Sequence, residues 1–166
     1  MLPVPKGAAM LNLIRDLWIQ GGFLASQLFN ERSFYEPFTK DVRRAKKRIV
    51  IESPYLTERR ARYYAPLFRK LASRKVKIRI NTRHPRYHNN GMREQAEGAI
   101  KILLAAGAKV YTYNDLRHWK LAILDNTVLW EGSLNILSHG RSREIMRRSR
   151  SRFFCRKMLD FAKPYN

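Results

Sequence analysis

The feature that most restricts how this chain can fold is an alternation of short β-branched segments with longer segments of helical periodicity. The predicted strands cover residues 48–54, 75–81 and 109–115, and the predicted helices cover residues 33–47, 57–74 and 92–108. Strands that alternate with helices are typical of α/β domains, because parallel neighbouring strands need long crossover connections. We therefore expect a mixed, largely parallel β-sheet flanked by helices on both faces.

After the third predicted strand, the pattern changes to strands that follow one another directly. Residues 118–125 and 127–133 resemble a strand pair joined through Asp125 and Asn126, and residues 144–149 a last strand. No linker divides the chain after residue 32, so we expect residues 33–166 to form one domain that ends in a basic tail.

Residues 1–32 form a separate N-terminal segment, because residues 1–30 are apolar and carry only three charged side chains, those of Lys6, Arg15 and Asp16. Leu13, Leu17 and Trp18 recur at helical spacing, which predicts an N-terminal apolar helical segment. Three roles remain open for it. It can pack on the domain, offer residues 8–30 to a second subunit or another protein partner, or associate with a membrane surface.

We expect neither an integral membrane span nor an export signal. Arg15 and Asp16 interrupt the apolar stretch, and the longest uncharged run, residues 17–30, is too short to cross a bilayer comfortably. The single cysteine, Cys155, cannot form an intramolecular disulfide, which is typical of a reducing compartment. The sequence therefore predicts a cytoplasmic protein.

The charge of the chain indicates a polyanionic partner. Lysine and arginine total 34 against 13 acidic residues, which gives a net charge of +21. Nucleic acid is the first expectation for such a charge, and an anionic membrane surface is the second. Three basic runs, at residues 40–48, 69–79 and 141–157, can bind a phosphate backbone without reading its sequence. Each run taken alone is equally typical of a solvated helix face.

Two segments supply the candidate nucleic-acid contacts. Residues 82–88 follow a predicted strand, at the edge where α/β sheets bind ligands, and the basic tail supplies the rest. The candidates are Arg83, Arg86, Arg141, Arg143, Arg147 and Arg148. His84 and His88 lie in the same loop, but Pro85 opposes a helical arrangement of the pair, so we expect no metal site there.

The strand pair carries the residues with the most chemical content. His118 and Lys120 share a face if they lie in a strand, with Cα atoms about 6–7 Å apart. Ser133 and Asn135 share a face at the end of the returning strand, where Gly132 permits close backbone approach. Imidazole can attack phosphorus, and the ammonium, hydroxyl and amide groups can stabilise the oxygens of a five-coordinate transition state.

This arrangement has a known counterpart. The string His118-x-Lys120-x4-Asp125-x6-Gly132-Ser133-x-Asn135 resembles the signature of the phospholipase D superfamily, and all six positions match without a gap. A less specific resemblance extends from about Phe34 to about Ser149. The resemblance implies a phospholipase D-like fold and makes residues 33–166 a catalytic domain.

The resemblance also implies a mechanism. The motif histidine, His118, attacks phosphorus and forms a phosphohistidine. A second motif histidine protonates the leaving oxygen, and water then releases the product. Lys120 and Asn135 hold the phosphate, and no metal ion or other cofactor takes part.

Two acidic residues complete the candidate set. The motif aspartate, Asp125, has a more structural role in the family. This agrees with the alternation of side chains along a strand, which puts Asp125, seven residues after His118, on the opposite face. A glutamate shortly after the motif commonly orients a motif histidine, and Glu144 is the only acid between residues 132 and 159. Glu144 can equally be a salt-bridge partner of neighbouring arginines. The candidate catalytic residues are thus His118, Lys120, Asp125, Ser133, Asn135 and Glu144.

The number of motifs predicts the assembly. Larger members of the superfamily carry two motifs per chain, whereas this chain carries one. Short single-motif relatives build one active site across a two-fold axis. We therefore expect a homodimer with both His118 residues at the interface.

Together, these observations predict a metal-independent phosphodiesterase, in particular an endonuclease for DNA or RNA with little sequence preference. Two alternatives remain open. One is a non-catalytic nucleic-acid-binding module of a larger assembly, and the other is a phospholipid phosphodiesterase, which the apolar N-terminal segment would suit.

Overall fold

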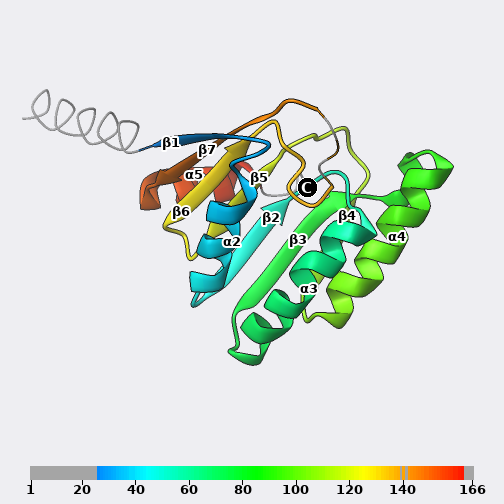
Figure 1. The fold of residues 1–166 in the computed structure, drawn as a ribbon, viewed down its shortest axis with the longest axis horizontal. Helices are drawn as coiled ribbons and strands as arrows, with labels where there is room; N and C mark the ends of the chain where they lie inside the picture. Colours follow the sequence, from blue (N-terminus) through cyan, green and yellow to red (C-terminus); the bar gives the residue numbers. More distant parts are fainter. Residues whose placement is uncertain (1–25, 139, 141, 163–166) are drawn as a thin grey trace, which may run out of the picture.

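The computed structural model describes residues 26–138, 140 and 142–162, which contain one seven-stranded sheet and its helices (Figure 1). The strands are β1 (Gln27–Asn30), β2 (Arg48–Glu52), β3 (Lys77–Arg83), β4 (Lys109–Tyr113), β5 (Leu121–Leu124), β6 (Val128–Gly132) and β7 (Ile145–Arg150). The helices are α2 (Tyr35–Arg44), α3 (Glu58–Ser73), α4 (Asn90–Ala105), α5 (Arg152–Phe161) and the 3-10 turn η1 (Pro85–Tyr87).

The sheet is mixed, with the strand order β1-β7-β6-β5-β2-β3-β4. Strand β2 is parallel to β3, and β3 is parallel to β4, whereas the other four pairings in the described part of the chain are antiparallel. The predicted mixed sheet is confirmed, but its parallel part is smaller than we predicted. The physical reason is the tight turn at Asp125 and Asn126, whose φ angles of 51° and 57° belong to a two-residue hairpin and make β5 and β6 antiparallel.

Helices cover both faces of the sheet, as the sequence predicts. Strand β5 shows the division, because Ala122 and Leu124 face one core while Leu121 and Ile123 face the other. The larger core contains the apolar sides of α2, α3 and α4, and the smaller core contains the apolar side of α5. Figure 1 shows α2 and α3 in front of the sheet and α5 behind it.

Two elements differ from the sequence-based expectation. Residues 27–30, predicted as part of the N-terminal helical segment, form strand β1, because they pair with β7 in the sheet. Helical structure before residue 26 lies outside the described residues. The basic tail forms helix α5, which begins where the Ser151 side chain accepts a hydrogen bond from the Phe154 N–H at 3.2 Å. Cys155 of this helix is fully buried.

Candidate active site

The pairing of β5 with its neighbours determines where the predicted site lies. Strand β2 ends at Glu52, whose register partner on the parallel strand β3 is Asn81, two residues before β3 ends. Strand β5 is antiparallel to β2, so its first residue, Leu121, pairs with Glu52. The residues just before β5 therefore lie at the carboxyl edge of β2 and β3, the edge where sheets of this class bind ligands.

His118 and Lys120 lie in the segment that leads into β5, not in the strand itself. Their side chains nevertheless meet, because Lys120 Nζ lies 2.6 Å from Nδ1 of His118. The same ammonium donates a hydrogen bond to the His118 carbonyl oxygen at 2.9 Å. An ammonium can only donate, so with Lys120 protonated the Nδ1 atom of His118 is the acceptor and the imidazole ring is neutral.

The second half of the motif is held beside the first by backbone contacts. The Gly132 N–H donates a hydrogen bond to the Lys120 carbonyl oxygen at 3.1 Å, which joins the end of β6 to the start of β5. A Cβ atom on Gly132 would overlap the carbonyl oxygen of Ile145 and lie 2.9 Å from Cα of Met146. Glycine is therefore required here for the close approach of β6 and β7, as the sequence predicts.

Ser133 and Asn135 have different surroundings. The Ser133 N–H donates to the Ile145 carbonyl oxygen at 2.9 Å, and the Ser133 hydroxyl oxygen accepts from the Ile145 N–H at 3.1 Å. Ser133 thus ties the motif to β7. The side-chain oxygen of Asn135 is buried and has no hydrogen-bond partner among the described residues. Such an atom in an enclosed position is a candidate for contact with a ligand.

Two residues that we did not predict as catalytic, Tyr55 and Arg83, act on His118, and Tyr55 also contacts His88. Tyr55 follows β2, and its ring centroid lies 5.5 Å from that of His118, edge to face, and 5.0 Å from that of His88. Arg83 ends β3, and its charge lowers the pKa of both histidines. Arg83 was selected because ligands bind at the carboxyl ends of strands in α/β sheets. Tyr55 lies at the same edge, just after β2, so the same rule applied to β2 would have selected it.

Burial and positive charge act together on the motif side chains. Burial, then Lys120, then Arg83 lower the pKa of His118 below its usual 6.5, so the ring is neutral at pH 7. Burial also lowers the pKa of Lys120, and the negative charge of Glu144 opposes that shift. Glu144 is therefore close enough to act on the ammonium that contacts His118. Its carboxylate also accepts a hydrogen bond from the Ser142 hydroxyl at 2.6 Å.

Asp125 does not lie with the other motif residues. It follows the last residue of β5, at the opposite end of the strand from Lys120. Its carboxylate accepts hydrogen bonds from the backbone N–H groups of Lys46, Lys47 and Arg48 at 2.8, 2.7 and 3.0 Å. Burial raises the pKa of Asp125, but these three donors lower it overall. This position agrees with the structural role expected of Asp125, and a direct part of Asp125 in catalysis stays a prediction.

Two of the predicted nucleic-acid contacts are engaged within the protein. Arg148 forms a bidentate ion pair with Asp41, with nitrogen–oxygen distances of 2.6 and 3.1 Å, and its side chain is only 13% exposed. Arg147 forms an ion pair with Glu131, a residue of the neighbouring strand β6. Because β7 lies between β1 and β6, the consecutive residues Arg147 and Arg148 point to opposite faces of the sheet, and each meets an acidic partner there. A contact of Arg147 or Arg148 with nucleic acid stays a prediction, and it would compete with these ion pairs.

The remaining predicted contacts are more open. Arg86 is exposed and donates to the Tyr87 hydroxyl at 2.7 Å, while Arg83 is half-buried with its guanidinium carbon 5.7 Å from the Tyr87 ring centroid. Arg143 is exposed. Arg141 lies outside the described residues. Arg83, Arg86 and Arg143 therefore stay candidates for contact with a phosphate backbone.

Two features are absent from the described residues. No group of three or more histidine, cysteine, aspartate or glutamate residues gathers there in a way that could hold a metal ion. No helix in residues 26–138 or 142–162 is long and apolar enough to cross a membrane.

Known proteins were compared with the chain by sequence and by fold. The family model described as "Cardiolipin synthase, PLD-like domain" matches residues 38–159. No curated protein matched the sequence.

Solved structures share the fold. The phospholipase D family member Nuc from Salmonella typhimurium superposes with a TM-score of 0.69 at 17% identity, over 82% of this chain and 90% of Nuc. NucT from Helicobacter pylori superposes with a TM-score of 0.65 at 20% identity, over 82% of this chain and 91% of NucT. TrmBL2, an archaeal chromatin protein, gives 0.56 at 11% identity, over 93% of this chain and 59% of TrmBL2. The family match runs from within α2 to within α5, contains strands β2 to β7 and includes the whole motif, and the chain therefore belongs to the PLD-like domain family.

Proposed function

We propose that the chain is a metal-independent phosphodiesterase that cleaves nucleic acid, with His118 as its nucleophile. The observation that carries the proposal is the 2.6 Å contact between Lys120 Nζ and the Nδ1 atom of a neutral His118. A neutral imidazole has a lone pair for attack on phosphorus, and an ammonium beside it can receive the negative charge of the phosphate.

The first chemical step follows from this pair. A bound phosphodiester is a stronger acceptor than the imidazole, so Lys120 turns its N–H groups to the phosphate oxygens and releases the ring. A ring nitrogen of His118 then forms a bond to phosphorus while the bond to the leaving oxygen breaks. Asn135 supports the phosphate, because rotation of its side chain by 180° brings the amide N–H group to the position of the unpartnered oxygen.

The second step needs an acid and later a base. His88 contacts Tyr55 at the site but lies outside the His-x-Lys motif, whose second copy supplies the acid in the family that the chain resembles. We assign the role to the partner subunit's His118 in a homodimer, which protonates the leaving oxygen. The resulting neutral imidazole accepts a proton from water as water attacks phosphorus, which breaks the bond to the first His118 and releases a phosphate monoester. Glu144 orients one of these histidines or holds Lys120.

Charge favours nucleic acid over lipid as the substrate. A net charge of +21 suits a polymer of phosphates, and TrmBL2 is described as binding DNA. The family model is named for cardiolipin synthase, so a phospholipid phosphodiester is the alternative to test. A non-catalytic binding module is the other alternative, and the complete motif argues against it.

The test is cleavage of single-stranded DNA, duplex DNA, RNA and cardiolipin vesicles in excess EDTA. We expect cleavage of at least one nucleic acid, its loss in His118→Ala, and its retention in His88→Gln. Retained cleavage in His118→Ala would refute the mechanism. Cleavage of cardiolipin alone would refute the substrate class, and binding without cleavage would favour the module.

Mixed dimers test the shared site. A differently tagged wild-type subunit is paired with a His118→Ala subunit, and the heterodimer is isolated. If each site needs both histidines, the heterodimer is inactive, whereas independent sites would leave it half as active as the wild type.

A further inference from the structure

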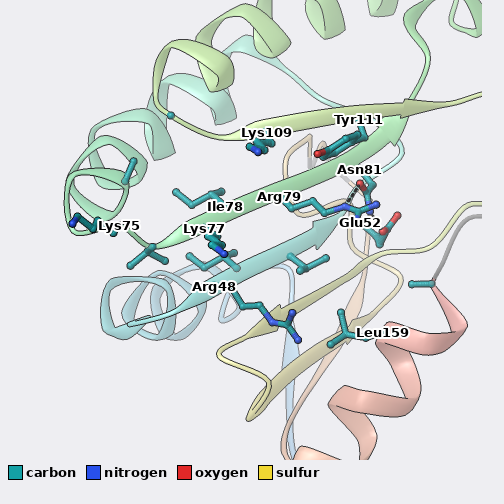
Figure 2. Close-up of a pocket in the computed structure, with 16 residues that line it drawn as sticks. Arg48, Glu52, Lys75, Lys77, Ile78, Arg79, Asn81, Lys109, Tyr111 and Leu159 are labelled. Carbon is teal, nitrogen blue, oxygen red and sulfur yellow. Dashed lines mark hydrogen bonds between the residues drawn. The ribbon is translucent and has the colours of Figure 1, made fainter.

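A groove of about 560 Å³ lies on the sheet face opposite α2 and α3, beside helix α5 (Figure 2). Ile49 and Ile51 of β2 and Ile78 and Ile80 of β3 face the larger core, so the alternate residues of these strands face the groove. The groove-facing cationic residues on the strands are Arg48, Lys77, Arg79 and Lys109. Half of the strand residues that face the groove are thus basic.

Strand register places these cations in rows across the sheet. Arg48 pairs with Lys77, and Arg79 pairs with Lys109. Neighbouring strands lie about 4.8 Å apart, and alternate residues on one strand lie about 6.7 Å apart. The backbone positions that carry these cationic side chains are therefore regularly spaced on neighbouring strands (Figure 2). Such spacing suits a ligand with repeated negative charges.

A second hollow continues this surface. It shares Arg48 and Leu159 with the groove, so the two are contiguous. The added cationic residues are Lys46, Lys47, Arg152 and Arg156. The basic surface thus extends from β4 across β2 to helix α5 and the turn between β5 and β6.

Carboxylates within this surface do little to cancel its charge. Glu52 and Asp125 are the acids that line the two hollows. Glu52 is fully buried, accepts a hydrogen bond from the Asn81 amide, and has its pKa raised first by burial, which favours the neutral form. The Asp125 carboxylate accepts three backbone hydrogen bonds. The exposed cations therefore dominate the surface.

One end of the groove carries an aromatic side chain. Tyr111 is 48% exposed, and the guanidinium carbon of Arg79 lies 4.8 Å from its ring centroid. Tyr111 is the register partner of Asn81 on β3, and Asn81 is the register partner of Glu52 on β2. Glu52 in turn pairs with Leu121 of β5, three residues after His118. This end of the groove therefore lies at the same sheet edge as the candidate active site.

We propose that the groove between α5 and β4, with its continuation along Arg48, is an accessory binding site for single-stranded nucleic acid. The cations bind the phosphates, and Tyr111 stacks on a base, which is how proteins bind single strands without sequence preference. A strand held there leaves the groove at the edge that carries His118. The assignment rests on the proposed function in one respect, the choice of nucleic acid as the polymer. An acidic polypeptide could match the charge but offers no bases for Tyr111.

Binding is measured on the full-length chain carrying His118→Ala, in EDTA, with a labelled single strand of about 20 nucleotides. The groove variant is Lys77→Gln/Arg79→Gln/Lys109→Gln, and the matched control is Arg69→Gln/Lys70→Gln/Arg74→Gln. The control removes the same charge from exposed positions at the end of α3.

We expect the groove variant to lose on the order of tenfold in affinity at about 0.1 M salt, and the salt slope to fall by about 2, since each single-strand phosphate contact contributes about 0.7. The control should change much less. Equal losses in the two variants, or no loss in the groove variant, would overturn the proposal. Tighter binding of a duplex through the same residues would overturn the assignment to single strands.

Stacking is tested separately. Tyr111→Ala should weaken single-strand binding by on the order of fivefold or more, and Tyr111→Phe should restore it. Polyglutamate is the competing ligand, and if it binds the groove as tightly as the oligonucleotide does, nucleic acid is the wrong partner. Hydrolysis of bis(4-nitrophenyl) phosphate, a diester too small to span the groove, should be unchanged in the groove variant with His118 intact. Oligonucleotide binding thus tests the groove, and hydrolysis of the small diester tests the His118 site, so a failure of one proposal can be told from a failure of the other.

Discussion

Lys120 Nζ lies 2.6 Å from the Nδ1 atom of His118, although neither residue belongs to the strand that follows them. The contact has two consequences. It keeps a positive charge beside the imidazole, which disfavours protonation of the ring, and it places the ammonium where a phosphate bound to His118 would carry its charge.

The first prediction concerns the pH dependence of this pair. Burial, the Lys120 charge and the Arg83 charge lower the pKa of His118, so the nucleophilic form persists to lower pH than in a free histidine. Lys120→Gln removes one of these causes, and we expect the pKa of His118 to rise and the acidic limb of kcat/KM to move to higher pH. We also expect kcat to fall about 10²–10³-fold. The pKa is read from the His118 ring signals by NMR, with Lys101→Gln as a control on the exposed face of α4. An unmoved pKa would contradict the argument.

The second prediction concerns Tyr55, which packs against both His118 and His88. In Tyr55→Ala, water gains access to His118, so its pKa should move up toward 6.5 and diester hydrolysis at pH 6 should fall. Tyr55→Phe keeps the ring and should behave as wild type in both measurements. A loss of activity in Tyr55→Phe would instead indicate that the hydroxyl takes part in the reaction.

The third prediction separates a structural role of Asp125 from a catalytic one. Asp125→Ala leaves three backbone N–H groups without their acceptor, and we expect a loss of about 1–3 kcal/mol in the free energy of unfolding, measured in urea. Hydrolysis per folded molecule should be unchanged. A loss of hydrolysis in fully folded protein would instead indicate that Asp125 takes part in catalysis.

The same site predicts a pH dependence of stability. The pKa of Asp125 is lower in the folded protein than in the unfolded chain, so its ionised form stabilises the fold above the unfolded pKa of about 4. That contribution disappears as the pH falls through the lower, folded pKa. The stability difference between wild type and Asp125→Ala should therefore narrow in acid, and a constant difference would argue against the ionised carboxylate as its source.

The fourth prediction concerns Gly132. In Gly132→Ala, the new Cβ would meet backbone atoms of Ile145 and Met146, so β6 and β7 must separate. We expect a loss of about 1–3 kcal/mol in unfolding free energy and a strong loss of hydrolysis, because the Gly132 contact with Lys120 aligns the motif. Gly91→Ala is the matched control, since nothing lies within 4 Å of its added Cβ and helix α4 should gain about 0.5–1 kcal/mol. Equal effects of the two substitutions would show that the close approach at Gly132 is unimportant.

Local patterns in the sequence predicted most elements of the fold. The helices α2, α3 and α4 and the strands β2, β3 and β4 lie close to their predicted positions, because periodicity reports which side of an element is buried. Strand β1 and helix α5 were missed for a common reason. Each depends on a distant partner, β7 for β1 and the core beside β5 for α5.

The sequence by itself determined the α/β class, the high positive charge and the set of motif residues around His118, because these depend on composition and on neighbours along the chain. Only the tertiary structure decided what each charged residue faces. Arg148 pairs with Asp41 from 107 positions away, and the basic run at residues 69–79 divides between the surface of α3 and the groove. The physical reason is that strand pairing and sheet packing join segments far apart in the chain, and no local periodicity records which segments will meet.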